Sequence, residues 1–440
     1  MSTAIIELKG VGKSFKSADG SARTVLEGVD FRLAEGEIVA LLGPSGSGKS
    51  TLLRILAGLI GADTGDVRYR GQPLYAPARG VGMVFQSFAL FPWLTVQGNV
   101  ELGLEARGMA KPERAKRAEA AIALIGLAGF EGALPRELSG GMRQRVGIAR
   151  ALVIEPEVLL MDEAFSALDV LTGERLREDI LELWTGRTLP TQAMLVVSHN
   201  IEEAVLMADR VLIFASHPGQ VRFQLAVQLP RPRDPESAQA RELIDEVYAL
   251  MTAGTVRGGR PSEEPARLLL TERLPDADIG RMEGLLELLA GDTFQGHADL
   301  PRLAEETELT DDALLPLAQA VSLLGLARLA DGDLHLTPLG QRYVEGEHTL
   351  RQELFGQQLL GHVPLAAHIR HSLEQEPSGE LPEEPFIRLL SESLAADEAV
   401  QVLRIAIEWG RHGEVFEYNY NTGVIHLPQG EAQREADANA

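Results

Sequence analysis

The sequence predicts an α/β first domain built on a mostly parallel sheet, followed by a mainly helical second domain. In the first half, short apolar runs such as Glu37–Leu42, Val158–Asp162 and Met194–Ser198 alternate with helical patterns. Strands that alternate with helices are typical of βαβ units. Charge also divides the chain. Residues 1–230 hold 24 Lys and Arg against 26 Asp and Glu, whereas the remaining 210 hold 17 Arg, no Lys and 38 acidic residues. This asymmetry indicates two different modules.

The composition excludes several classes of protein. Of the 440 residues, 45% are hydrophobic and 24% charged, which is ordinary for a globular protein. Because there is no cysteine, structural disulfides and thiolate metal sites are excluded. No apolar run approaches the roughly 20 residues that span a bilayer, so we expect any membrane role to require a partner. The acidic second half repels phosphate backbones, so we expect no nucleic-acid partner.

Breaks in composition predict the segments of the chain. A Pro-rich stretch, Leu229–Pro235, separates the two halves, and a helix is expected near Ala240–Met251. The polar C-terminal end is expected to be disordered. The predicted segments are the first domain (1–230), a linker with one helix (231–265), the acidic second domain (266–428) and a disordered tail (429–440).

The first domain is expected to contain an antiparallel accessory sheet beside its core. Ile5–Leu8, Val25–Leu33 and Val67–Arg70 are its predicted strands. Gly80–Phe85 and Arg210–Ala215 are further core strands. The predicted helices are Lys49–Leu56, Pro112–Ile125, Gly140–Val153, Leu171–Trp184 and Ile201–Ala208.

The second domain shows the order of a winged-helix unit. Two helices joined by a tight turn precede a hairpin; these are Leu300–Glu306, Asp311–Leu324, Leu326–Ala330 and Leu334–Thr337. The second helix begins with two aspartates and has no Lys or Arg before Arg328. Since phosphate contacts need cations, we expect an interaction or regulatory role for this unit and not DNA binding.

A glycine-rich loop follows the strand Glu37–Leu42. Its residues are Gly43, Pro44, Ser45, Gly46, Ser47, Gly48, Lys49, Ser50 and Thr51. The glycines allow backbone N–H groups to surround phosphate oxygens, and the following helix adds its positive N-terminus. Lys49 is expected to reach the β- and γ-phosphates and Ser50 to bind Mg²⁺. The alternative is a Gly/Ser-rich turn, which the strand before and the helix after disfavour.

The apolar strand Val158–Asp162 ends in two acids. Asp162 is placed to hold the Mg²⁺ shell, and Glu163 to act as general base for the attacking water. Acids often end buried strands for other reasons. Their position after the phosphate loop favours the catalytic interpretation.

The stretch Leu138–Arg150 combines a helix cap with two glycines. Ser139 stands at the expected N-cap, and Gly140 and Gly141 open the backbone, which makes a second anion site. The alternative is a capped amphipathic helix. Two phosphate-binding helix termini far apart in the sequence suggest a dimer that sandwiches the nucleotide.

Over residues 1–230 the chain resembles an ABC transporter ATPase subunit, with an ABC-type P-loop NTPase fold that includes a helical subdomain. The family's signature falls on Leu138–Gly141, its D-loop on Ser166–Asp169 and its base-stacking aromatic on Phe15. Its Q-loop glutamine falls on Gln86 and its switch histidine on His199.

The resemblance implies a role for each of these residues. Gln86 binds Mg²⁺ or water and senses the membrane partner, and His199 contacts the γ-phosphate. Ser139, Gly140 and Gly141 contact the γ-phosphate held by a second copy of the chain, and Asp169 crosses that interface. Phe15 stacks on adenine. Taken singly, such a Phe is commonly core, such a His structural and such a Gln on the surface.

Three positions depart from the family pattern. Met142 replaces the usual glutamine of the signature, Ala164 follows the base where proline is common, and Asn200 follows the switch histidine where aspartate is common. None removes a group that performs chemistry. Ala164 and Asn200 are expected to affect rate or loop rigidity.

Phe88–Val96 and Met161–Asp169 resemble the nitrate, sulfonate and taurine branch of importers. This implies ATP and Mg²⁺ as cofactors, a separate transmembrane permease, and a binding protein as an indirect partner. It also implies a peripheral location on the cytoplasmic face of the plasma (inner) membrane. In the family, the region of Leu90–Leu94 faces the coupling helix of the membrane subunit; the alternative is a folded-in apolar loop.

The second domain resembles the AAA-associated C-terminal domain, on the segment Ile407–Tyr418. It leaves open an alternative function, a soluble regulatory ABC ATPase in which this domain is the sensor or effector. His362, His368 and His371 lie close in sequence, but no ordered acid–histidine pattern accompanies them. We therefore expect surface or packing histidines there and no metal site.

Overall fold

The computed structural model describes residues 4–16, 22–44, 46–166, 168, 170–187, 189–215, 218–252, 270–330, 332–394 and 396–428. Some residues that carry sequence predictions lie outside these ranges: Ser45, Asp169 and the tail 429–440. Residues 253–265 of the predicted linker also lie outside them. The chain forms two compact units, Met1–Val247 and Tyr248–Ala440. Among the described residues, no helix is both long and apolar enough to cross a membrane.

The first unit is built from ten strands and eight helices among its described residues. The strands are β1 (Ala4–Lys16), β2 (Ala22–Ala34), β3 (Glu37–Leu42), β4 (Thr64–Tyr69), β5 (Gln72–Pro73), β6 (Val81–Val84), β7 (Val158–Asp162), β8 (Ala193–Val197), β9 (Arg210–Ala215) and β10 (Gln220–Ala226). The helices are α1 (Lys49–Leu56), α2 (Val96–Ala106), α3 (Lys111–Leu124), the 3-10 helix η1 (Pro135–Glu137), α4 (Gly140–Leu152), α5 (Val170–Thr185), α6 (Ile201–Met207) and α7 (Ala238–Thr252), which contains the division between the units.

The core of the first unit is a six-stranded sheet in the order β10-β9-β3-β8-β7-β6. Its strands pair in parallel except for β10, which joins the edge antiparallel to β9. Every residue of β7 and β8 is buried, which explains why both read as continuous apolar runs and not as alternating ones. The predicted mostly parallel sheet is confirmed.

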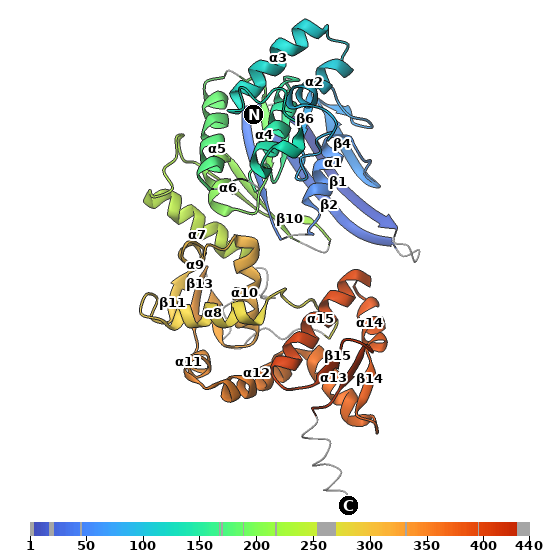
Figure 1. Ribbon diagram of the computed structural model, residues 1–440, viewed down its shortest axis with the longest axis vertical. Coiled ribbons are helices and arrows are strands. Elements are labelled where there is room, and N and C mark those ends of the chain that lie inside the picture. Colours follow the sequence, from blue (N-terminus) through green and yellow to red (C-terminus); the bar gives the residue numbers. More distant parts are fainter. Residues whose placement is uncertain are drawn as a thin grey trace, which may run out of the picture. The chain divides into compact units, whose positions relative to one another are not determined.

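A second, antiparallel sheet and a helical group complete this unit. The second sheet runs β2-β1-β4-β5, as the accessory strands predicted. One buried cluster joins apolar side chains of both sheets with those of α1. Helices α2, α3 and α4 pack on one another, and Figure 1 shows them together. They form the helical subdomain that the family resemblance implies.

The second unit is mainly helical. Its helices are α8 (Ile279–Ala290), α9 (Leu300–Thr307), α10 (Asp311–Leu323), α11 (Pro338–Glu345), α12 (His348–His362), α13 (Pro364–Gln375), α14 (Glu384–Ser391) and α15 (Ala396–His412). Its strands are β11 (His297–Asp299), β12 (Ala327–Ala330), β13 (Asp333–Leu336), β14 (Glu380–Pro382), β15 (Glu417–Asn419) and β16 (Val424–His426).

The winged-helix order of the second unit is confirmed. Helices α9 and α10 precede the hairpin β12–β13, and β11 joins that hairpin in the order β11-β13-β12 (Figure 1). Beyond it, the indole N–H of Trp409 donates to the carbonyl of Ala277 at 3.2 Å. The Trp409 ring also meets Phe355 edge to face. This aromatic packing anchors α15. The sequence did not predict β11 or the small sheet β14-β16-β15.

Candidate functional site

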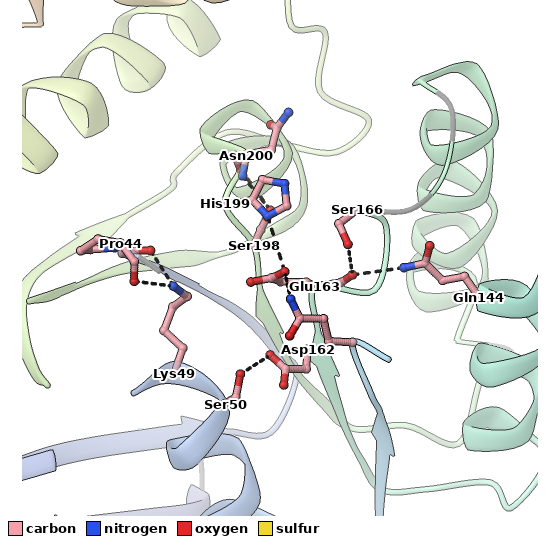
Figure 2. Close-up of polar contacts among 12 residues, drawn as sticks. Pro44, Lys49, Ser50, Gln144, Asp162, Glu163, Ser166, Ser198, His199 and Asn200 are labelled. Atoms are coloured by element: carbon pink, nitrogen blue, oxygen red, sulfur yellow. Dashed lines mark hydrogen bonds and ion pairs between the residues drawn. The ribbon is translucent and has the colours of Figure 1, made fainter. Parts of the chain in front are cut away.

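The predicted site residues meet at one edge of the six-stranded sheet. Gly43 follows β3, Gln86 lies two residues after β6, Glu163 follows β7 and His199 lies two residues after β8. Because these strands are parallel, their carboxyl ends share one edge, which is where open α/β sheets bind ligands. Figure 2 shows side chains from these loops converging there.

The loop Gly43–Thr51 curls around a lysine. The Lys49 ammonium donates to the carbonyls of Gly43 at 2.6 Å and Pro44 at 2.9 Å (Figure 2). Gly48 caps α1 with φ 96°, and a Cβ there would lie 2.8 Å from the Leu26 side chain. Only glycine fits that position without strain. The turn therefore brings a cation and the positive N-terminus of α1 to one place, which suits an anion.

Ser50 and Asp162 form the second part of the site. The Ser50 hydroxyl donates to a carboxylate oxygen of Asp162 at 3.1 Å (Figure 2). Asp162 is only 3% exposed, and this burial raises the pKa of its carboxyl group. The hydroxyl of Ser50, the carboxylate of Asp162 and the amide oxygen of Gln86, whose Nε2 donates to Glu163, are hard oxygen ligands. This donor set fits Mg²⁺.

The backbone of Glu163 is fixed from two sides. Its φ of 49° is left-handed, which costs a non-glycine residue about 1–2 kcal/mol. Its N–H donates to the carbonyl of Val197 on β8 at 3.0 Å. Its carbonyl accepts from Gln144 at 3.1 Å and from the Ser166 hydroxyl at 2.9 Å (Figure 2). These bonds hold the strained turn, so the direction of the carboxylate is set by the fold and not by the side chain alone.

The carboxylate of Glu163 lies between an amide and an imidazole. Its Oε2 accepts a 2.6 Å hydrogen bond from Nε2 of Gln86. The same oxygen lies 3.8 Å from Nδ1 of His199. The three side chains come from the ends of β6, β7 and β8. Such a carboxylate, oriented by neighbours and still partly open to solvent, can accept a proton from water.

Two departures from the family pattern have structural explanations. Asn200 is the N-cap of α6, and its Oδ1 accepts from the Glu203 N–H at 2.6 Å. Asparagine caps as well as aspartate, so the change keeps the helix start. Ala164, the residue after Glu163 in the sequence, is buried, with 1% of its surface exposed. The left-handed turn at Glu163 is therefore formed without a proline.

Arg150 holds the segment after Gln86. Phe88 and Ala89 both have left-handed φ values, 60° and 45°. The guanidinium of Arg150, in the last turn of α4, donates to their carbonyls at 2.8 and 2.5 Å. Burial lowers the pKa of Arg150. Neither this residue nor Gln144 was predicted from the sequence, although both belong to the stretch Leu138–Arg150.

Aromatic side chains follow the same segment. Trp93 is 72% exposed, and its ring lies 5.3 Å from that of Phe91, which is also exposed. Burying such rings is favourable, so exposed aromatic pairs mark contact surfaces. The interpretation of Leu90–Leu94 as a folded-in loop does not fit this exposure.

Ser139 is the N-cap of α4. Its hydroxyl accepts from the Met142 N–H at 3.2 Å, and its carbonyl from Arg143 at 3.1 Å. Among the described residues, its hydrogen bonds thus stay within the first turn of α4. Phe15, near the end of β1, is 43% exposed, and the Lys13 ammonium lies 5.4 Å from its ring centroid. Both are available to a ligand or a second chain.

The three histidines considered as metal ligands are not brought together. His362 bonds Gln358 at 3.2 Å and His371 bonds Gln375 at 2.8 Å, each within its own helix. His368 meets the ring of Phe386 edge to face. These are packing and surface contacts.

Comparisons with known proteins find similarity in both halves of the chain. The family model described as ABC transporter matches residues 26–166, and the model described as C-terminal AAA-associated domain matches residues 301–419. The chain is 43% identical over 225 residues to the nitrate import ATP-binding protein NrtD of Synechocystis sp., covering 51% of this chain and 83% of that protein.

Two further relatives and one solved structure are similar to part of the chain. Identity is 38% over 249 residues to the aliphatic sulfonates import ATP-binding protein SsuB of Bacillus cereus, covering 57% of this chain and 96% of that protein. It is 40% over 228 residues to the taurine import ATP-binding protein TauB of Pseudomonas syringae pv. tomato, covering 52% and 85%. The dimeric post-hydrolysis structure of the ATP-binding cassette MJ0796 with ADP and Pi is 33% identical, with a TM-score of 0.47 over 51% of this chain and all of that one.

Proposed function

The chain belongs to the ABC transporter family of ATP-binding proteins, and from this premise we propose that it is the ATP-hydrolysing subunit of an importer. The imported substrate is a small anion such as nitrate, a sulfonate or taurine, which are the substrates in the names of its relatives. The observation that carries the proposal is the convergence of Lys49, Asp162, Glu163 and His199 at the carboxyl edge of one parallel sheet.

The loop Gly43–Thr51 binds the phosphates of ATP in this proposal. Its backbone N–H groups and the N-terminus of α1 face the phosphate oxygens, and Lys49 neutralises them. Ser50, Asp162 and Gln86 would supply the oxygen ligands of Mg²⁺, and the bound ion would offset charge on the phosphates. Phe15 offers an exposed ring at the end of β1 for stacking on adenine.

Glu163 is the proposed general base. Its carboxylate accepts the proton of the attacking water, with Gln86 and His199 holding its orientation. His199 then contacts the γ-phosphate and stabilises its developing charge. The bonds of Gln144 and Ser166 to the Glu163 carbonyl make both residues positioning residues.

The site is completed by a second copy of the chain. Ser139, Gly140 and Gly141 form a helix N-terminus whose hydrogen bonds stay within α4, so it is free to meet the γ-phosphate bound by another subunit. Asp169 is assigned to the same interface by the family pattern. Hydrolysis would then depend on dimerisation.

The exposed aromatic pair Phe91 and Trp93 is the proposed contact with the permease. It follows Gln86 by a few residues, and Arg150 fixes the backbone between them. Movement of the permease would thus reach the residue that bonds Glu163. This places the chain at the cytoplasmic face of the membrane as a peripheral subunit, with the binding protein as an indirect partner.

We further propose that residues 1–230 are the motor and 266–428 a regulatory module. The relatives above align with only about half of this chain, 51–57%, while most of their own length is covered. A first unit without the second is therefore a working arrangement in the family. Truncation after Met251 is expected to leave ATP hydrolysis in place and to remove its control; unchanged activity under every substrate condition would count against a regulatory module.

The experiment for the importer function is co-expression with any permease and binding-protein genes that lie beside the gene for this chain. We expect the three proteins to purify together from detergent-solubilised membranes and hydrolysis to rise when the binding protein carries its anion. Trp93→Ala is expected to weaken the association, and Tyr75→Ala, which removes another exposed aromatic at 91%, is the matched control.

Two outcomes would overturn the importer proposal. One is a chain that hydrolyses ATP but remains in the supernatant with no permease bound. The other is hydrolysis that does not respond to nitrate, alkanesulfonate or taurine on the binding protein. Either would favour the soluble regulatory ATPase.

A further inference from the structure

One face of the three-stranded sheet in the second unit gathers two histidines and an aspartate. His297 lies on β11, and Asp333 and His335 lie on β13. One ligand atom from each residue lies within 4.8 Å of the other two. We propose that these three side chains bind one divalent transition-metal ion of the zinc type. All three proposed ligands belong to the second unit.

The strand register sets the cluster. His297 and His335 are direct partners across β11 and β13, and Asp333 lies two residues before His335, so all three point to the same face. The Leu336 N–H donates to the carbonyl of Gly296 at 2.7 Å. The next pair, His297 and His335, is therefore of the kind without mutual hydrogen bonds, in which side chains are closest. Their rings lie 4.4 Å apart and 23° from parallel.

The buried residues on the opposite face of the sheet fix the register of β11 and β13. Ala298, between His297 and Asp299, is 3% exposed, and Leu334, between Asp333 and His335, is fully buried. A shift of β13 by one residue in register would turn Leu334 to solvent and His335 into the core. Figure 1 shows β11 beside β13, with α8 and α10 in the same unit. The apolar core thus holds the three ligands on the polar face.

The distances suit one small ion. Nε2 of His297 and Oδ2 of Asp333 lie 3.0 Å apart. Around a tetrahedral zinc ion, with Zn–N of about 2.0–2.1 Å, neighbouring ligand atoms lie roughly 3.3 Å apart. The ligand atom of His335 lies within 4.8 Å of the other two. The three ligand atoms therefore lie close to the spacing that one ion requires.

The ligand types select the class of metal. Two imidazoles and one carboxylate suit zinc, cobalt, nickel, copper or iron, whereas calcium and magnesium prefer oxygen ligands. No thiolate competes elsewhere, because the chain has no cysteine. Three protein ligands leave at least one coordination position for water or an anion. The site could thus take a second ligand through the metal.

A plain surface ion pair is the competing explanation. It accounts for the bond between His297 and Asp333 but not for the second imidazole stacked on the first. The two explanations differ over Arg328, the exposed partner of His335 on β12. A cation beside a metal site weakens metal binding, so Arg328→Ala should tighten it; an ion pair alone makes no such prediction.

The test is a Zn²⁺ titration of the full-length, untagged chain without nucleotide, in competition with a chromophoric chelator. We expect one Zn²⁺ per chain, and visible d–d absorption when Co²⁺ replaces it. Asp333→Asn and His335→Asn should each weaken Zn²⁺ binding at least about 100-fold. Loss of a residue that only hydrogen-bonds to a metal ligand usually has a smaller effect. His371→Asn, which changes an exposed histidine on α13, is the matched control and should bind as the unchanged protein does.

Circular dichroism of each variant confirms that it is folded, and Asp333→Asn keeps the size of the side chain. The absence of stoichiometric Zn²⁺ binding by the folded, unchanged protein would overturn the proposal. So would binding that survives both Asp333→Asn and His335→Asn. None of these results depends on ATP hydrolysis, because no ligand belongs to the first unit.

Discussion

The two polar clusters of this chain are built on different kinds of sheet. At the edge of the six-stranded parallel sheet, Gln86, Glu163 and His199 each come from the end of a separate strand. In the second unit, His297 and His335 meet across the face of an antiparallel sheet through their register. A site at strand ends can be recognised one motif at a time. A site on a sheet face requires knowing which residues pair, which no single motif reveals.

The ATPase cluster and the proposed metal cluster are expected to act independently, and loss of Lys49 tests this. Lys49→Ala removes the cation held by Gly43 and Pro44, so ATP binding and hydrolysis should fall by at least about 100-fold. Zn²⁺ binding by the second unit should not change. Nucleotide binding, phosphate release and the Zn²⁺ titration measure this together. Lys116→Ala, which removes an exposed lysine on α3, is the control; a joint loss of both activities would show that the clusters are one system.

The loop after Gln86 tests whether strand-end residues depend on contacts that their motifs do not show. Arg150→Ala removes both bonds to the carbonyls of Phe88 and Ala89. Losing these two hydrogen bonds from a charged group, one exposed and one part-buried, should cost about 1–3 kcal/mol, and hydrolysis should fall about tenfold through Gln86. Thermal unfolding and phosphate release are the measurements. Arg136→Ala is the control; wild-type activity in a folded Arg150→Ala protein would show that the loop holds itself.

The burial of Asp162 at the strand-end site is expected to lower the stability of the fold. A carboxyl group whose folded-state pKa is raised destabilises the fold once pH exceeds the unfolded-state pKa, because ionisation is harder in the folded state. Asp162→Asn should therefore raise the melting temperature at pH 7, by roughly 2–4 °C for each 1 kcal/mol, while hydrolysis falls. Below about pH 4 the difference should vanish. A melting temperature that drops at pH 7 would contradict the sign.

The smallest expected effect concerns the cap of α6. Asn200→Ala removes the acceptor for the Glu203 N–H and should cost about 1 kcal/mol, whereas Asn200→Asp should be close to neutral. Chemical denaturation measures both. Equal losses in the two variants would mean that Asn200 has a role other than capping.

Much of the first unit was predictable because its signals are local. The predicted helix Lys49–Leu56 and strand Arg210–Ala215 match α1 and β9 residue for residue. Glycines, caps and buried apolar runs act within a few residues of the structure they determine. Helix α2 was not predicted, although Thr95 caps it by accepting from the Gly98 N–H, because its apolar pattern merges with the preceding loop.

The second unit shows where local signals end. The hairpin β12–β13 was predicted from its turn, but β11 is three residues long and pairs with a strand more than 30 positions away. Tertiary packing selects the partner strand of β11. The sequence around His297 therefore did not indicate that it would lie beside His335. The same limit hid Arg150, whose acceptors Phe88 and Ala89 lie about 60 positions before it.

Glu163, at the carboxyl edge of the parallel sheet, is proposed to remove the proton of the water that attacks ATP. The most direct measurement is steady-state phosphate release by Glu163→Gln at saturating ATP and Mg²⁺, with Glu119→Gln on α3 as the control. We predict that Glu163→Gln still binds ATP, associates into a dimer in its presence and releases phosphate at least about 100-fold more slowly, while Glu119→Gln is unchanged. Turnover by Glu163→Gln at close to the normal rate would contradict the account.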